Sequence, residues 1–211
     1  MKSNINLLEP GKRYHVYNRG INGENLFKED RNYSFFLQKY MQYVEPVAKT
    51  YAYCLLKNHF HLLVEIRPIE EIKAHFSAPG QTPDYQLKFQ DEYSVGLFAG
   101  RQFGHLFNGY AQSINKAYKR TGGLFEEPFR RIPVETDSYF SALIWYIHYN
   151  PQKHRFVADF KEYLHSSYQI HLSDNPTKLE REAVLNWFGG KAGYLEYHNN
   201  QHNISDMEEG F

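Results

Sequence analysis

The chain has a single cysteine and no long apolar run. Cys54 has no second cysteine to pair with, which excludes a disulfide framework and fits a reducing cytosol. No apolar stretch approaches the roughly 18 residues of a membrane-spanning helix, and the opening MKSNINLLEPGKRYH contains no signal-peptide core. We therefore expect a cytoplasmic protein with no membrane partner, built as one good-sized domain in 211 residues.

The chain also lacks net charge, with 24 basic and 24 acidic side chains. Net charge alone therefore indicates neither a nucleic-acid binder nor a membrane binder. The charges are unevenly distributed, because residues 101–155 carry 8 basic and 4 acidic side chains and residues 156–211 carry 4 and 9. A basic middle segment followed by an acidic end indicates either a contact surface for phosphates or an ordinary solvated face.

Periodicity divides the chain into strands and helices. Alternation of polar and apolar residues predicts strands over residues 13–21, 47–57, 59–66 and 129–135. Apolar residues at helical spacing predict helices over residues 31–45, 104–120, 138–150 and 177–189. The stretch 67–103, rich in proline, glycine and polar residues, is interpreted as an insertion with at most a short helix near 69–76.

Residue types at the expected helix ends predict where three of these helices begin or stop. Asp30 is expected to cap the first, Gly122 and Gly123 to end the second, and Pro151 to end the third. The third should begin at one of the cap candidates Thr136, Asp137 or Ser138.

The order of these elements is strand, helix, strand, strand, helix, strand. That order is typical of an α+β ferredoxin-like sandwich, an antiparallel sheet with two helices on one face. The helix at 138–150 is then an addition to the sandwich. We expect a domain over residues 1–155, which includes the insertion, and a helical C-terminal extension over 156–211 with a flexible polar end.

Two histidines interrupt the apolar run YCLLKNHFHLLVEI of residues 53–66. On a strand, His59 and His61 project to the same face while Phe60 points to the other. Two adjacent imidazoles can share a divalent ion. An ordinary pair of core or surface histidines is the alternative, although the apolar residues that follow indicate the start of a central strand.

A tyrosine and an asparagine on the expected third helix can complete such a site. Tyr146 and Asn150 are four residues apart and therefore lie on one helix face. Asn150 can supply an oxygen ligand of the kind that Mg²⁺ and Mn²⁺ require, and Tyr146 is then a candidate nucleophile. The chain has 18 tyrosines, so ordinary packing is the alternative, and Tyr139 and Tyr149 compete for the role on the same helix.

Three stretches of the chain resemble the single-tyrosine HUH transposases, in the branch called REP-associated tyrosine transposases. They are YHVYNRGINGENLF, the run around His59-Phe60-His61, and YFSALIWYIHYNPQKHRFV, in which residues 146–151 match the pattern Tyr-Ile-x-x-Asn-Pro. GLFEEPFRRIPVE and FKEYLHSSYQIHL are similar to further family segments, except that Phe125 and the pair Leu164-His165 stand where tryptophan is common. The resemblance covers about residues 12–66 and 104–172.

The resemblance implies a metal-dependent enzyme that acts on single-stranded DNA at hairpins formed by short palindromic repeats. His59, His61 and Asn150 would hold Mg²⁺ or Mn²⁺, and the ferredoxin-like fold would form the palm. Tyr146 would attack the scissile phosphate to give a 5′-phosphotyrosine and a free 3′-hydroxyl, ready for strand transfer. Relatives act as monomers or as homodimers, and the sequence leaves both states open.

Basic residues near these motifs are candidates for contacts with the DNA backbone. Arg19 belongs to the resembling segment at the first strand. The remaining candidates are Lys116, Lys119, Arg120, Arg130, Arg131, Lys153 and Arg155. Each of them, taken singly, is also compatible with a plain surface charge.

Three other functions remain open at this stage. A protein of the same descent could bind DNA hairpins without cleaving them. A ferredoxin-like RNA-binding module would account for the many aromatic residues, although no RNP-type run is present. A metal-dependent phosphohydrolase would use the two histidines, but it would leave the spacing of Tyr146 and Asn150 unexplained.

Overall fold

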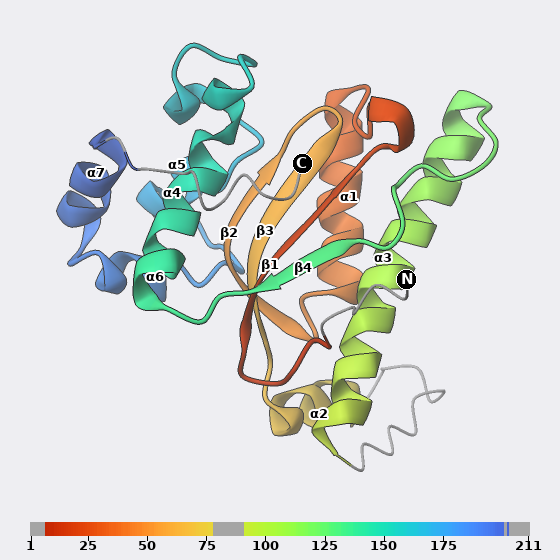
Figure 1. Ribbon diagram of the computed structural model, residues 1–211, viewed down its shortest axis with the longest axis horizontal. Helices are drawn as coiled ribbons and strands as arrows, with labels where there is room; N and C mark the ends of the chain where they lie inside the picture. Colours follow the sequence, from red (N-terminus) through yellow and green to blue (C-terminus); the bar gives the residue numbers. More distant parts are fainter. Residues whose placement is uncertain (1–6, 78–90, 201, 203–211) are drawn as a thin grey trace.

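A four-stranded antiparallel sheet forms the centre of the protein. The computed structural model describes residues 7–77, 91–200 and 202. The sheet has the order β2-β3-β1-β4 (Figure 1), with strands β1 (Arg13–Arg19), β2 (Ala48–Leu55), β3 (His59–Ile66) and β4 (Arg130–Pro133). This is the strand order of a ferredoxin-like sandwich, so the α+β fold class expected from the sequence is confirmed.

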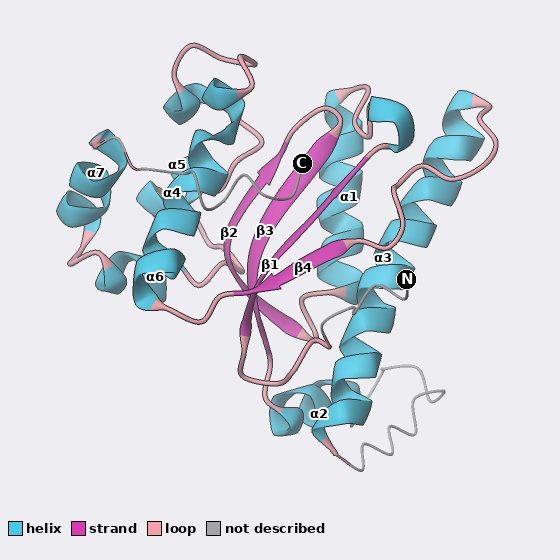
Figure 2. Cartoon of the chain, in the orientation of Figure 1, coloured by secondary structure: helices cyan, strands magenta, loops and turns pink. Residues whose placement is uncertain are grey.

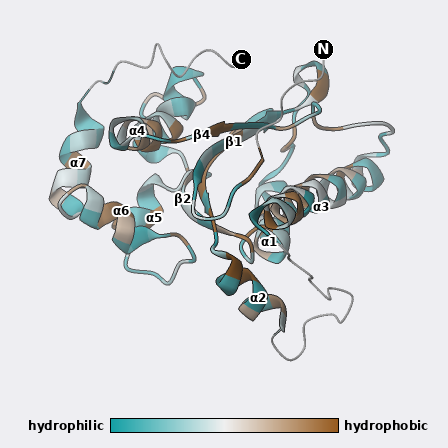
Figure 3. Cartoon of the chain, turned by 60° about the horizontal axis from the view of Figure 1, so that its bottom comes forward, coloured by the Kyte–Doolittle hydropathy of each residue, from teal (hydrophilic) through white to brown (hydrophobic). Residues whose placement is uncertain are grey.

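Helices cover both faces of the sheet (Figure 2). Two of them, α1 (Asp30–Tyr43) and α3 (Glu92–Tyr118), pack on one face. The other face is covered by α4 (Asp137–Lys153), and α5 (Tyr168–Leu172), α6 (Arg181–Trp187) and α7 (Lys191–Asn199) lie beside it (Figure 3). Smaller elements are α2 (Ile69–Ser77) and the 3-10 turns η1 (Ile21–Gly23) and η2 (Phe160–Glu162). None of the described helices is long and apolar enough to cross a membrane.

Strand alternation divides the interior into two cores. On β3, Phe60, Leu62 and Val64 point toward α1 and α3 and belong to the first core. Leu63 points the opposite way, into a second core under α4. His59 and His61 share the face of Leu63, which is why the additional helix meets the two histidines.

Helix α3 begins twelve residues earlier than the sequence predicts, at Glu92 rather than at residue 104. The glycines at 96, 100 and 104 indicate a loop by propensity, but packing requires a glycine at position 96. A Cβ on Gly96 would lie 2.6 Å from Leu7 Cγ, so the glycine allows the N-terminal segment to cross the helix. The expected insertion therefore contains α2, as predicted near 69–76, and the first turns of α3. Residues 78–90 lie outside the described part.

Several helix ends differ from the predicted ones. Helix α1 is capped by Glu29 in a reciprocal capping box with Asn32, so Asp30 is the first helical residue and not the cap. Helix α3 ends at Tyr118 and not at Gly122 or Gly123, and it is capped by Lys119, which takes the left-handed conformation with φ of 52°. Thr136 caps α4 as predicted, but this helix runs through Pro151 to Lys153.

The C-terminal extension contains more helix than predicted. The helix expected over 177–189 is shorter, because α6 spans only Arg181–Trp187, and α5 and α7 were not predicted. The extension also touches the sheet edge, through bridges from Cys54 to Ser166 and from Thr50 to Leu179. Most of the polar end, which we expected to be flexible, lies outside the described residues.

Candidate active site

The two histidines of β3 lie buried at the beginning of the strand, on the face covered by α4. Their ring centroids are 5.3 Å apart and the ring planes are nearly perpendicular. Burial, together with nearby His154 and Arg19, lowers the pKa of His59 to about 3. Burial likewise holds the pKa of His61 well below its usual value. Both imidazoles are therefore neutral at pH 7, the form that binds metal ions.

Each of these histidines has a partner that orients its ring. The Nδ1 of His59 lies 2.8 Å from the amide oxygen of Asn58, and an oxygen can only accept, so this nitrogen carries the proton. The Nδ1 of His61 lies 2.9 Å from Nε2 of His15 on β1. These contacts engage both Nδ1 atoms, in the manner of outer-shell partners in metal sites, so Nε2 is the atom of each ring that we expect to bind a metal.

Helix α4 brings Tyr146 and Asn150 to the same place. The ring of Tyr146 is centred 5.6 Å from that of His61 in an edge-to-face arrangement. The amide nitrogen of Asn150 donates to the Tyr146 carbonyl over 2.8 Å. The Asn150 side chain also interacts with His59 and favours the protonated form of that ring. The structure therefore brings together all four residues that the sequence singled out.

Two positive charges, those of Lys153 and Arg19, lie near this group. Lys153, one turn beyond Asn150, places its ammonium 5.0 Å from the centroid of the Tyr146 ring. The charge of Arg19 acts on His59 as well. The His154 ring is centred 4.8 Å from that of His59, but burial lowers the pKa of His154, so this ring is mainly neutral at pH 7. Arg19 is ion-paired with Glu126 over 2.8 Å. A phosphate that reached the site would meet a favourable potential.

The chemistry of these side chains is compatible with a divalent ion, since imidazole nitrogens and an amide oxygen are both known metal ligands. Two neutral imidazoles and one amide oxygen make three protein ligands, which leaves further positions for water or phosphate oxygens. In the described part of the chain, no cluster of three or more His, Cys, Asp or Glu side chains is arranged to hold a metal.

Access to the site is restricted. Tyr146, His61 and Asn150 have no exposed surface, and His59 is only 5% exposed. Lys153, Tyr17 and His15 are among the side chains that lie against this group. A DNA strand can therefore reach Tyr146 only after covering side chains have moved.

The basic residues proposed for DNA contact lie in different surroundings. Arg130 is exposed and its charge acts on Tyr17, beside the site. Arg120 is held by Glu24 through two hydrogen bonds, and Arg131 points to the other face of the sheet, over the Phe129 ring. The other exposed candidates are Lys116, Lys119 and Arg155. The C-terminal ends of α3 and α4 lie at the same end of the sheet as the β2–β3 turn (Figure 1).

A buried chain of hydrogen bonds ties α4 to the C-terminal extension. His148 lies 2.7 Å from Ser167 Oγ through Nε2 and 2.9 Å from His198 Nε2 through Nδ1. His198 Nδ1 lies 2.8 Å from the Tyr194 carbonyl, which can only accept. This carbonyl fixes the donor of each hydrogen bond in the chain. His198 donates to Tyr194, His148 donates to His198, and Ser167 donates to His148. Ser167 Oγ also accepts from the Tyr53 amide over 2.9 Å.

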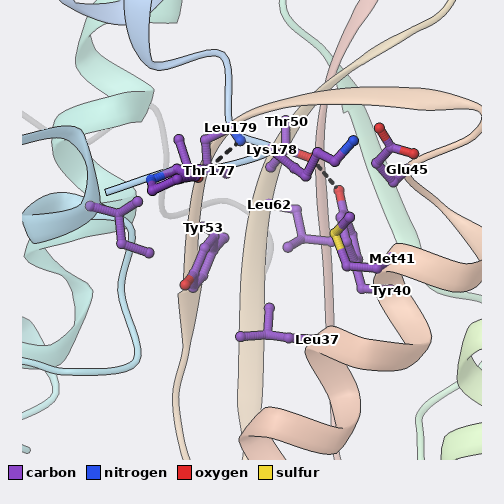
Figure 4. Close-up of a pocket in the computed structure, with 12 residues that line it drawn as sticks. Leu37, Tyr40, Met41, Glu45, Thr50, Tyr53, Leu62, Thr177, Lys178 and Leu179 are labelled. Carbon is purple, nitrogen blue, oxygen red and sulfur yellow. Dashed lines mark hydrogen bonds between the residues drawn. The ribbon is translucent and has the colours of Figure 1, made fainter. Parts of the chain in front are cut away.

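Two hollows lie away from this group, on the opposite face of the sheet. One of about 430 Å³ lies between α1, β2 and the segment 176–179, and its walls are mostly apolar (Figure 4). In it, Tyr40 and Thr50 hydrogen-bond to each other over 2.7 Å. A second hollow of about 500 Å³ lies between α3 and the loop before β4.

Sequence reasoning missed the roles of His15 and of the chain from Ser167 to His198. His15 stands in the quoted YHVYNRG segment, and alternation places it on the face of His59 and His61. The antiparallel register, which sets His15 opposite Leu63 and Tyr17 opposite His61, was needed to bring its ring beside His61. His198 lies in a helix that the sequence did not predict, so no signal pointed to it.

Comparison with known proteins supports this architecture. No protein-family model and no curated protein matches the chain. Among solved structures, a REP-associated tyrosine transposase bound to a REP hairpin is similar, with a TM-score of 0.53 and 13% sequence identity. The match covers 83% of this chain and 88% of that one. The protein therefore has the fold of a REP-associated tyrosine transposase, as its sequence motifs suggested.

Proposed function

We propose that the protein is a metal-dependent endonuclease and strand transferase for single-stranded DNA, acting in the cytoplasm at hairpins formed by palindromic repeats. The shared fold supports DNA hairpins as partners, because the similar solved protein is bound to one. The observation that carries the proposal is the meeting of Tyr146 with the two histidines, with ring centroids of Tyr146 and His61 5.6 Å apart.

The phenolic oxygen of Tyr146 is the proposed nucleophile. It attacks the phosphorus of the scissile phosphodiester, the bond to the 3′-oxygen breaks, and a 5′-phosphotyrosine forms. The phenolic proton is released and the departing 3′-oxygen takes up a proton, so the products are the covalent adduct and a free 3′-hydroxyl. Because a phosphodiester replaces a phosphodiester, a second strand can be joined without ATP.

The surrounding residues bind and orient the phosphate. Mg²⁺ or Mn²⁺ held by His59, His61 and Asn150 would supply Lewis-acid polarisation of a phosphate oxygen. Asn58 and His15 fix the ring orientations of the two histidines. Lys153 attracts the phosphate toward Tyr146 by charge, at a site from which water is largely excluded.

The same burial favours a second candidate function, a DNA-hairpin binding protein that does not cleave. A nucleophile with no exposed surface is compatible with a protein that binds DNA hairpins while Tyr146 stays buried and does not react. Both functions share the DNA partner and differ only in whether Tyr146 reacts.

A covalent trapping assay separates the two. The purified chain is incubated with Mn²⁺ and labelled single-stranded oligonucleotides from repeats flanking its gene, then denatured in SDS. We expect a slowly migrating adduct that requires the metal and disappears in Tyr146→Phe and in a His59→Ala/His61→Ala double variant.

Two tyrosines of the same helix serve as matched controls. Tyr139→Phe and Tyr149→Phe should retain the adduct, and a band that survives in Tyr146→Phe would reassign the nucleophile to one of them. Tight hairpin binding with no adduct under any metal would instead establish the non-cleaving function.

A further inference from the structure

The apolar hollow between α1, β2 and residues 176–179 has the size of a small-ligand site. Its volume is about 430 Å³, within the usual range for such pockets. Leu37 and Met41 line it from α1, and Tyr53 and Leu62 line it from the sheet. Both strand residues belong to the core on the α1 side, so the hollow is separate from the candidate active site on the other face.

The C-terminal extension forms one side of this hollow. The Glu180 amide donates to the Thr50 carbonyl over 2.9 Å, and Leu179 forms a parallel bridge with the same strand residue. Ile170 of α5 and Pro176 also line the hollow. A ligand in the hollow would therefore touch α1, the sheet and the extension at once.

The walls are apolar at one end of the hollow. Figure 4 shows Leu37 at that end, with Leu62 and Tyr53 above it. Leu62 and Tyr53 are only 1% and 8% exposed, whereas Met41 is 37% exposed, so the hollow opens to solvent beside Met41. This end suits an apolar group, because the free energy gained on binding rises with the apolar area that leaves water.

The other end presents hydrogen-bond donors (Figure 4). The hydroxyl oxygens of Tyr40 and Thr50 lie 2.7 Å apart, and because one proton joins them, the second hydroxyl proton can serve an acceptor in the hollow. Thr177 Oγ1 accepts the Leu179 amide over 3.1 Å, and its own proton has no acceptor among the described residues. Lys178 is exposed, and no carboxylate in the described ranges forms an ion pair with it. A ligand group that only accepts hydrogen bonds fits this end.

Glu45 is an acceptor at the same end, but Arg67 already engages it. Arg67 donates to the Glu45 carbonyl over 2.8 Å and to its carboxylate over 3.2 Å. Arg67 also pairs with Glu71 over 3.0 Å, and Glu71 pairs with Lys49 over 3.1 Å. Together with Lys178, this group has three cations and two anions, so one positive charge is left. The charge balance therefore favours an anionic ligand group over a cationic one.

We propose that this hollow binds a small straight-chain carboxylate, such as a medium-chain fatty acid. An ionised carboxylate only accepts hydrogen bonds, so it matches the ammonium of Lys178 and the hydroxyls of Thr50 and Thr177. The hydrocarbon chain packs between Leu37 and Leu62. This binding activity goes beyond the proposed action on DNA and does not depend on it.

Isothermal titration calorimetry of the full chain tests the proposal. The probes are hexanoate, heptanoate and octanoate, each below its critical micelle concentration, with octanol as the uncharged analogue. We expect the affinity to rise about four-fold with each added methylene group. Lys178→Gln should weaken octanoate binding about five-fold and leave octanol binding unchanged, because only the carboxylate pairs with the ammonium.

Two further variants make the result interpretable. Met41→Trp places a large ring beside the opening of the hollow and should abolish binding of both octanoate and octanol. Lys119→Gln removes another exposed lysine, at the end of α3, and should leave both affinities unchanged. If Met41→Trp fails to fold by circular dichroism, Lys178→Gln still decides the outcome, because it changes only an exposed side chain.

The outcomes separate this inference from the proposed function. Absence of carboxylate binding, or octanoate binding unchanged in Lys178→Gln, overturns the carboxylate site. Equal affinities across the three chain lengths overturn it as well. Self-association in sedimentation experiments that Met41→Trp abolishes, without any octanoate binding, would assign the hollow to a second copy of the chain instead. Each of these results leaves the proposed action on DNA standing, since the adduct with hairpin DNA is measured independently.

Discussion

Replacing Ser167 by alanine should destabilise the fold strongly for so small a change. Ser167 has no exposed surface, and its Oγ makes two hydrogen bonds, from the Tyr53 amide and to His148 Nε2. Alanine leaves both buried partners unsatisfied, at about 1–3 kcal/mol each. We therefore expect a loss of about 3 kcal/mol in the free energy of unfolding, or roughly 6–12 °C in Tm at about 2–4 °C per kcal/mol for a chain of this size.

The neighbouring serine provides the matched control. Ser166 is also buried, but among the described residues its Oγ makes one hydrogen bond, accepted from the Tyr168 amide over 3.1 Å, so Ser166→Ala should cost about 1 kcal/mol. Urea unfolding at pH 7, followed by circular dichroism, gives both values. A cost for Ser167→Ala no greater than that for Ser166→Ala would refute the directed hydrogen-bond chain.

Two further predictions concern pH and charge. Burial lowers the pKa of His171 and of His198 to about 4, against about 6.5 in an unfolded chain, so their stabilising contribution is complete above pH 6.5 and is lost as the pH falls toward 4. In urea unfolding, the free energy of unfolding should fall about 1.4 kcal/mol per pH unit more steeply over this window in the parent chain than in His198→Gln, and equal slopes would contradict the assignment. The titratable or charged groups that face these two histidines are His148, Lys161, Arg181 and His202. Lys153→Gln should weaken single-stranded DNA binding and reduce the slope of the logarithm of the binding constant against the logarithm of the salt concentration by about 0.7. Arg120→Gln should leave that slope unchanged, because Glu24 already engages Arg120. If the two variants behave alike in a titration across salt concentrations, Lys153 makes no phosphate contact.

Much of the sheet could be predicted because its strands alternate cleanly. The apolar run of β3 and the turn at Asn58 locate a central strand, and the order of elements then gives the topology. Helix α3 could not be bounded, because Gly96 lowers helix propensity while the packing of Leu7 against it requires a glycine. Helix α7 buries only Tyr194 and His198, which is too few apolar positions to produce a periodic signal.

The candidate site was accessible to sequence reasoning where spacing within one element defines it. His59 and His61 share a strand face, and Tyr146 and Asn150 share a helix face. What could not be predicted depends on contacts between distant segments. His15 reaches His61 only through strand register, and Arg131 was grouped with Arg130 although strand alternation sends the two side chains to opposite faces.

The chain from Ser167 to His198 bears on where the protein can be cut into smaller functional units. A fragment that stops at residue 155 would retain every proposed ligand and the proposed nucleophile. It would also lack the serine and the histidine that hydrogen-bond to His148, a side chain that has no exposed surface in the full chain. Expressed fragments should therefore extend at least to His198, since the helix that carries Tyr146 is held in place by hydrogen bonds from His148 to Ser167 and His198.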